Sequence, residues 1–207
     1  MNFKYYKRTN LIIFILVLSV TLGKIMNYLE PYINKYEILK QINDFMGVFS
    51  VVGLLGLILL FIDSIGWKWK LFNWLIDVPN LNGRYKGKLI STYNGNTEMD
   101  CIIEVFQTAS IVKLYCYFGN LSSGIISSES RSYTEEIICE PNGLNKLIYT
   151  FKNDSDIAVN LNDHQGAGTL SYYKDIKKLD GTYFNRRGNT GKIEVIFQQK
   201  ELLKRFV

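Results

Sequence analysis

One stretch of the sequence constrains the fold more than any other. Phe45 to Ile62 runs for 18 residues without a charged side chain. A helix needs about 20 mostly apolar residues to cross the hydrocarbon core of a bilayer, within a range of roughly 17–25. A soluble domain that buried such a helix on all sides would need more chain than the 207 residues provide. The stretch therefore predicts a membrane span over about 45–65, ended by Asp63 and Gly66.

A second apolar segment precedes this span. It runs from Leu11 to Gly23 and extends to a span of about 10–29 if Lys24 reaches to the membrane interface. A signal peptide is the alternative, because basic residues precede the apolar stretch (Lys4, Lys7 and Arg8). No A-x-A-like cleavage site follows, which favours a retained span. Residues 1–66 are therefore expected to form a two-helix transmembrane hairpin.

The flanking charges and cysteines predict the topology. Basic residues precede the first span and Lys68 and Lys70 follow the second, whereas charges between the spans nearly cancel. The positive-inside rule then places both ends in the cytoplasm. Residues 67–80 form an interfacial linker that holds every tryptophan of the chain, although these side chains alternatively pack onto the following domain. Reduced thiols suit this location, and the cysteines show no disulfide pattern (Cys101, Cys116 and Cys139).

The overall composition excludes several classes of protein. The net charge of +5, from 24 basic and 19 acidic residues, is too small for a typical DNA- or RNA-binding face. One histidine and three cysteines leave little material for a transition-metal site. The mean hydropathy of +0.01 resembles that of a soluble protein, but it averages a membrane hairpin with a polar domain.

After Pro79 the hydrophobic period changes from that of helices to that of strands. Ile193, Val195 and Phe197 alternate with mostly polar residues, and turn residues separate similar runs. Eight short strands joined by tight turns predict an all-β domain over 81–200, an eight-stranded, up-and-down, lipocalin-like barrel. A two-sheet sandwich is the alternative. The expected strands lie near 83–92, 98–108, 110–118, 123–139, 146–153, 166–174, 179–187 and 191–199.

The sequence favours ligand binding over catalysis. His164 has no nucleophile placed by spacing, so we expect no enzyme, no catalytic residue and no cofactor. Tyr183, Asn185 and Arg187 share one face of a strand, where an arginine can bind phosphate and a tyrosine can stack on a base. The alternative is a Tyr–Arg packing pair that closes the barrel. Short polar residues near 122–128 either line a cavity or belong to a surface hairpin.

Several segments together resemble a known family. They are Leu81-Asn-Gly-Arg-Tyr-Lys-Gly, Gln107-Thr108, Leu147-Ile-Tyr-Thr-Phe-Lys-Asn153, His164-Gln-Gly-Ala-Gly-Thr-Leu170 and Gly181-Thr-Tyr-Phe-Asn-Arg-Arg with Gly191. Their order, spacing and attachment to a membrane hairpin resemble the two-transmembrane, β-strand-rich effectors of bacterial CBASS anti-phage systems, which act with a cyclic-nucleotide synthase of the CD-NTase type.

The resemblance implies a cytoplasmic barrel that binds a cyclic dinucleotide as its activating ligand. Binding would drive self-association in the inner membrane, and the spans would then disrupt the lipid bilayer and cause abortive infection. The resemblance also implies a set of pocket residues, with Arg187 preferred over Arg186 because it shares a face with Tyr183. The set is Tyr85, Gln107, Thr108, Tyr149, Asn153, His164, Thr169, Tyr183 and Arg187.

Two other functions fit the same sequence features. A membrane-anchored, lipocalin-like carrier or sensor of an apolar ligand would have a barrel interior dominated by aliphatic and aromatic side chains, without Arg187 inside. A structural membrane protein whose barrel docks a partner would have a filled interior.

Overall fold

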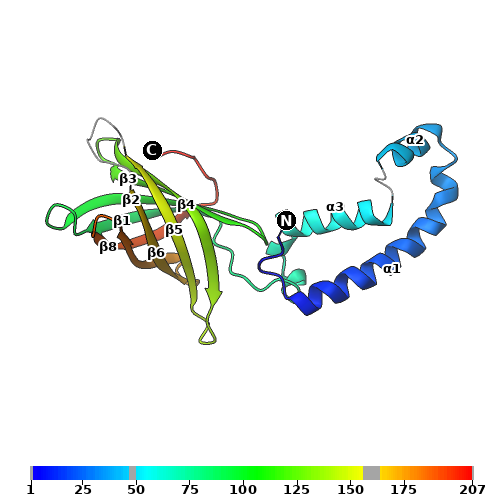
Figure 1. Ribbon diagram of the computed structural model, residues 1–207, viewed down its shortest axis with the longest axis horizontal. Coiled ribbons are helices and arrows are strands. Elements are labelled where there is room, and N and C mark those ends of the chain that lie inside the picture. The colour runs from blue at the N-terminus through cyan, green and yellow to red at the C-terminus, as the bar shows by residue number, and fades with distance from the viewer. Residues whose placement is uncertain (1, 47–49, 156–163, 207) are drawn as a thin grey trace. The chain divides into compact units, whose positions relative to one another are not determined.

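A computed structural model describes residues 2–46, 50–155 and 164–206 of the chain (Figure 1). Two compact units divide these residues. The first comprises Met1–Asp77 together with Thr108–Ile111, and the second comprises Val78–Gln107 with Val112–Val207. The first unit thus contains the helices together with Thr108–Ile111, and the second unit contains the strands.

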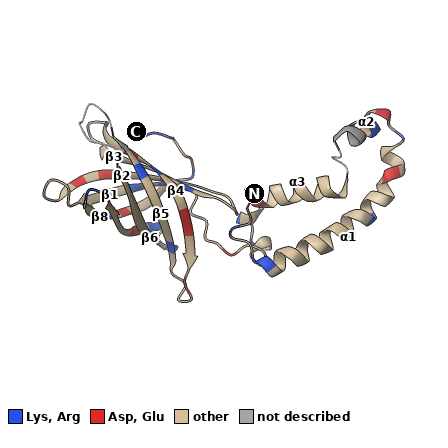
Figure 2. Cartoon of the chain, in the orientation of Figure 1, with Lys and Arg blue, Asp and Glu red and all other residues tan. Residues whose placement is uncertain are grey.

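Among its described residues, the helical unit contains one helix that is long and apolar enough to cross a membrane. Helix α1, Arg8–Ile33, has 26 residues, and Figure 2 shows few charged residues along it. A second apolar helix, α3, is shorter, at 14 residues from Val51 to Ser64. It begins at Ser50, whose hydroxyl accepts a hydrogen bond from the Gly53 amide at 3.0 Å, so the regular helix starts later than the predicted span over 45–65.

The remaining elements of the helical unit include one helix that the sequence pattern did not predict. Helix α2 runs from Glu37 to Met46, and residues 47–49 of the predicted second span lie outside the described part. Two short 3₁₀ turns, η1 at Gly66–Lys68 and η2 at Lys70–Phe72, follow α3. In this linker the Trp67 side chain is buried whereas Trp69 and Trp74 are about half exposed.

The second unit is a closed barrel in which all eight strands of the described residues pair antiparallel with their sequence neighbours, and β8 pairs with β1. This confirms the predicted up-and-down barrel and excludes the sandwich. The strands are β1 Gly83–Ser91, β2 Thr97–Gln107, β3 Val112–Asn120, β4 Ile125–Cys139, β5 Asn145–Ser155, β6 His164–Tyr173, β7 Lys178–Asn185 and β8 Thr190–Gln199.

Alternation along the strands separates the barrel interior from its outer face. Inside, one half of the barrel is filled by large, fully buried side chains such as Tyr85, Ile103 and Leu147. The Tyr85 hydroxyl donates to the Leu81 carbonyl at 3.0 Å, and its ring packs edge-on against Phe197. This half is closed by its own side chains, and the cavity described below lies toward the other end of the strands.

Candidate ligand-binding site

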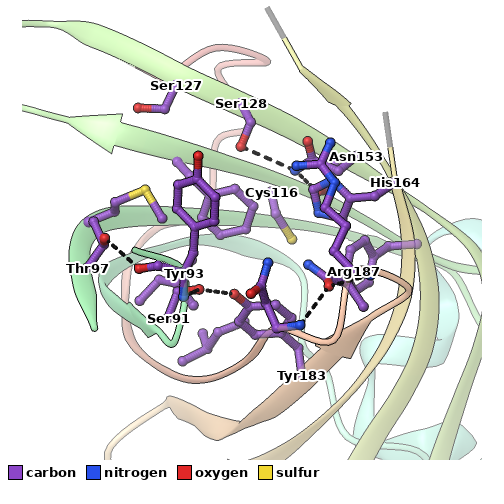
Figure 3. Close-up of a pocket in the computed structure, with 18 of the residues that line it drawn as sticks. Ser91, Tyr93, Thr97, Cys116, Ser127, Ser128, Asn153, His164, Tyr183 and Arg187 are labelled. Atoms are coloured by element: carbon purple, nitrogen blue, oxygen red, sulfur yellow. Dashed lines mark hydrogen bonds between the residues drawn. The ribbon is translucent and has the colours of Figure 1, made fainter. Parts of the chain in front are cut away.

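A cavity of about 370 Å³ opens at the end of the barrel that carries the β1–β2, β3–β4 and β7–β8 turns (Figure 3). Its lining comes from strands all around the barrel, so only barrel closure brings these residues together. The volume falls within the range of about 300–1,000 Å³ that is typical of small-molecule sites. The cavity is therefore large enough for part or all of a small organic ligand.

Three aromatic rings form one wall of the cavity. The Tyr149 and Phe151 ring centroids are 6.0 Å apart, and those of Phe151 and Tyr183 are 6.2 Å apart. His164 meets the Phe151 ring edge-on at 6.4 Å. Aromatic faces of this kind stack on nucleobases with little preference for sequence. The wall can therefore receive a flat, ring-bearing ligand.

Each of these rings lies directly over a glycine of the neighbouring strand. A Cβ atom added at Gly168 would lie 2.6 Å from the Tyr149 ring, which is closer than two carbon atoms can approach. A Cβ atom added at Gly166 would lie 2.5 Å from the Phe151 ring, and one added at Gly191 would lie 2.5 Å from the Tyr183 ring. Glycine is thus required for the rings to lie against the barrel wall. The register pairs are Tyr149 with Gly168, Phe151 with Gly166, and Tyr183 with Gly191.

Hydroxyl and amide groups face the same cavity. The Tyr183 hydroxyl donates to the Ser91 hydroxyl at 2.8 Å. The Asn153 amide donates to the hydroxyls of Ser130 at 2.9 Å and Ser128 at 3.2 Å. Figure 3 shows Ser91, Ser128, Asn153 and Tyr183 around the same space, and Ser127 and Ser130 also line the cavity. They supply the donors and acceptors that fix the orientation of a polar ligand.

The formal charge of the cavity is carried by one arginine. Arg187 lines it, and no aspartate, glutamate or lysine is among the described lining residues. Arg187 lies just beyond β7, in a turn where the Asn185 side chain accepts hydrogen bonds from the amides of Arg187 at 3.0 Å and Asn189 at 3.1 Å. A cation without a neighbouring acid in the lining favours an anionic ligand.

Burial keeps the acidic hydroxyl and thiol groups of the cavity protonated. It raises the pKa of the Tyr149 phenol well above its usual range and also raises that of Tyr183, although the hydrogen bond to Ser91 opposes the latter shift. Burial likewise raises the pKa of the Cys116 thiol to about 12. All three groups are therefore neutral at physiological pH, and none adds negative charge near Arg187.

Five of the nine sequence-predicted site residues line this cavity. They are Tyr149, Asn153, His164, Tyr183 and Arg187. The structure also distinguishes the two adjacent arginines, because Arg187 is in the lining and Arg186 is not. The Arg186 amide instead donates to the Gln165 carbonyl at 2.9 Å.

The other four predicted residues lie elsewhere. Tyr85 belongs to the filled half of the barrel, and Thr169 is not in the lining. The Gln107 side chain accepts from the Leu81 amide at 2.7 Å and donates to the Pro79 carbonyl at 2.9 Å, so it fixes the chain where it enters β1. The Thr108 hydroxyl accepts from two amides of its own turn.

Sequence reasoning did not single out several lining residues. Ser130 and Phe151 each lie two positions from a noted serine or a predicted residue on the same strand, and both line the cavity. The period of two along a strand was a signal that could have found them. Others come from turns or distant strands, including Ser91, Tyr93, Thr97 and Cys116.

Residues 76–196 match the family described as Cap15, cyclic dinucleotide receptor domain. No protein of curated function matches the chain. The matched range begins just before β1 and ends within β8, so it covers all of the barrel but the end of β8, and every described residue that lines the cavity.

Proposed function

The chain belongs to the Cap15 cyclic dinucleotide receptor family, which is a family of CBASS effectors, and we propose that the cavity at the barrel end is its ligand site. The observation that carries this proposal is the combination of one arginine, a wall of three aromatic rings and several hydroxyl and amide groups in one cavity. A cyclic dinucleotide has two bases and two phosphates. The lining holds aromatic rings that can stack on a base and an arginine that can bind a phosphate.

The contacts divide by chemistry. Arg187 would bind a phosphate, because a guanidinium forms paired hydrogen bonds to phosphate oxygens. Tyr149, Phe151 and Tyr183 would stack on a base. Asn153 and His164 would add hydrogen bonds to polar edges of the ligand. The predicted residues outside the cavity would stabilise the barrel and would not contact the ligand. Gln107 is an example, because its side chain binds the main chain before β1.

The lining argues against the alternative of an apolar-ligand carrier. Such a carrier would not be expected to place Arg187 in its cavity, whereas the described lining includes it. The barrel interior is also not filled throughout, which disfavours a purely structural docking domain. A receptor has no need of a catalytic group, and we propose that the protein is a receptor and not an enzyme.

The proposed function also includes insertion of the helices into a membrane. We infer that α1 and α3 insert into the bacterial inner membrane, with the barrel in the cytoplasm. At 1.5 Å per residue, the 26 residues of α1 give about 39 Å and the 14 residues of α3 about 21 Å, against a hydrocarbon core of about 30 Å. A helix shorter than the core thins the bilayer around it.

This mismatch supports a disruptive role for the helices after ligand-driven self-association. The infected cell would then die before the phage is released. A CD-NTase encoded nearby would make the ligand, and the ligand would have to bind the assembled state more tightly than the single chain in order to shift the equilibrium.

The test is ligand binding by the full chain in lipid nanodiscs. Isothermal calorimetry with cyclic dinucleotides of purine–purine, purine–pyrimidine and pyrimidine–pyrimidine composition should identify at least one ligand. Arg187→Ala should weaken its binding about 10- to 100-fold, because hydrogen bonds to a charged group contribute about 1.5–3 kcal/mol. The neighbouring Arg186→Ala is the matched control. Absence of binding to every compound, or equal affinity of the two variants, would refute the proposal.

A further inference from the structure

The outer face of strands β1–β3 is buried where strand alternation predicts exposure. Tyr85 and Ile103 point into the barrel, so their neighbours Arg84, Ile102 and Glu104 must point outward. These three residues are nevertheless only 3%, 1% and 1% exposed. Another part of the chain therefore covers them.

The cover is formed by residues 201–206, here called the C-terminal brace, which lie beyond β8. Glu104 accepts hydrogen bonds from the amides of Leu203 at 2.8 Å and Lys204 at 3.0 Å. Arg84 donates to Glu104 at 2.7 Å and to the main-chain carbonyls of Arg205 and Phe206. A buried ion pair thus holds the brace by its main chain.

Phe206 is the brace side chain that inserts into the barrel surface. It is 4% exposed and forms an apolar cluster with Ile102 and Tyr117, against which Leu121 and Ile126 pack. The fit is close on β3 as well, because a Cβ atom added at Gly119 would lie 3.1 Å from the Phe206 ring. Phe206 is therefore wedged under the β3–β4 turn.

The strand ends that this turn joins form a wall of the ligand cavity. Phe118 lies between Tyr117 and Gly119 and faces the cavity, and Ser127 and Ser128 directly follow Ile126 and line it too. The wall is a single strand layer with Phe206 on its outer side. Its register shifts between Phe118 and Gly119, so the regular ladder that would hold it is interrupted at this point.

The brace also adopts a conformation that its contacts impose. Lys204 has a φ of +55°, a left-handed backbone that a residue with a Cβ atom rarely adopts. Its amide is the group that donates to both carboxylate oxygens of Glu104. The buried ion pair on β1 and β2 therefore fixes the path of the chain that delivers Phe206 to the wall.

From this arrangement we propose that Phe206 is a positioning residue for the ligand cavity. With the brace in place, it supports the β3–β4 wall from outside and holds Ser127 and Ser128 where a ligand meets them. The Arg84–Glu104 pair positions Phe206 in turn. Ligand affinity and closure of the brace are then linked, and each strengthens the other by the same factor. This inference rests on the proposed function only for its ligand-binding part.

The test compares Phe206→Ala and Phe206→Leu with the wild-type chain in lipid nanodiscs. The first readout needs no ligand. Amide hydrogen exchange of residues 126–128 should become about 10-fold faster in Phe206→Ala and should be partly restored by the leucine. Ile196→Ala is the control, because Ile196 is an exposed residue of β8 outside the brace cluster. It should leave this exchange unchanged.

The second readout is affinity for the cyclic dinucleotide that the wild type binds in the panel above. Phe206→Ala should bind it about 10-fold more weakly than the wild type, and Phe206→Leu should fall between them. Ligand should in turn slow amide exchange of Leu203 and Lys204. If Phe206→Ala does not fold, the amide exchange and the ligand affinity of Phe206→Leu test the positioning role instead.

The outcomes separate the two proposals. Wild-type exchange at residues 126–128 in a folded Phe206 variant overturns the positioning role, whatever the ligand does. Faster exchange with unchanged affinity also overturns it and leaves Phe206 as a stabilising residue alone. If no cyclic dinucleotide binds the wild type, the ligand assignment fails, while the exchange readout still decides whether Phe206 supports the wall.

Discussion

The guanidinium of Arg84 lies 2.7 Å from the carboxylate of Glu104, and the two side chains are 4% and 1% exposed. They face each other across β1 and β2 on the outer surface of the barrel, where an ion pair would ordinarily be solvated. Residues 201–206 exclude the solvent from the pair, and both side chains form hydrogen bonds to the main chain of this segment. The pair is therefore both a cross-strand contact and the attachment point of a segment 100 residues away.

Replacing one member of this ion pair by an uncharged residue should strongly destabilise the barrel. Glu104→Leu leaves a buried guanidinium without its counter-ion, and such a change costs about 3–5 kcal/mol. The double variant Arg84→Met with Glu104→Leu should cost less than the sum of the single variants, because it leaves no unpaired charge. Urea unfolding followed by the β-sheet signal in circular dichroism measures both. Strictly additive losses would contradict a coupled pair.

The glycine beneath Tyr149 should be required for ligand binding. In Gly168→Ala the new methyl group would lie 2.6 Å from the Tyr149 ring, so the ring must move into the cavity. We expect at least about 10-fold weaker binding of the cyclic dinucleotide, since ring placement sets the stacking contribution of about 1–3 kcal/mol. Calorimetry measures the loss.

A suitable control substitutes a glycine with space around it. Gly56→Ala on α3 adds a methyl group with nothing within 4 Å and should leave binding unchanged. Wild-type affinity of Gly168→Ala would show that Tyr149 does not contact the ligand.

The buried thiol of Cys116 should make the barrel less stable at alkaline pH. Its pKa is raised by burial from 9.0 to about 12, so the folded state keeps the proton that the unfolded state releases. The stabilisation is complete below about pH 9 and is lost as the pH rises toward 12. The loss approaches 1.4 kcal/mol per pH unit, because the unfolded state binds fewer protons.

The measurement is the difference between variants from pH 8 to pH 10. Stability of Cys116→Ala should fall less steeply than that of the wild type over this interval, whatever its stability at pH 8. Cys139 is exposed, so Cys139→Ala should keep the wild-type slope. Parallel curves for all three proteins would mean that the thiol titrates alike in both states.

A charge within the apolar part of α1 should separate ligand binding from cell killing. Leu16 is 62% exposed on this helix, and arginine at a helix centre costs about 2.5–3.5 kcal/mol of insertion free energy. Leu16→Arg should therefore reduce the membrane-bound fraction and abolish toxicity in bacteria that make the ligand, while binding is retained. Tyr36→Arg, outside the helices, is the matched control. Full toxicity of Leu16→Arg would exclude α1 as the disruptive element.

Local patterns made much of the architecture predictable. The change from uncharged apolar runs to a period of two marks the boundary between helices and strands, and turn residues mark the strand ends. Asn94, Gly95 and Asn96 illustrate this, because all three adopt positive φ angles between β1 and β2. The start of α3 was less predictable, since the apolar run continues through the Ser50 cap.

The site was predictable only in part. Tyr149, Asn153 and Tyr183 line the cavity, and alternation correctly groups residues along one strand. Gln107 was expected beside them, yet its side chain binds the chain before β1. Depth along the barrel decides this difference, because one half of the interior is filled and the other half is open. A period of two reports which face a residue occupies and carries no information on depth.

The sequence by itself determined the apolar helical segments, the eight strands and the residues available to an anionic, ring-bearing ligand. These depend on periodicity, which is a local property of the chain. The tertiary structure decided which strand ends share a cavity and which outward residues are buried. In the sequence, Arg84 and Glu104 look like ordinary surface charges. In the structure, residues 201–206 cover them, and this contact joins positions about 100 residues apart.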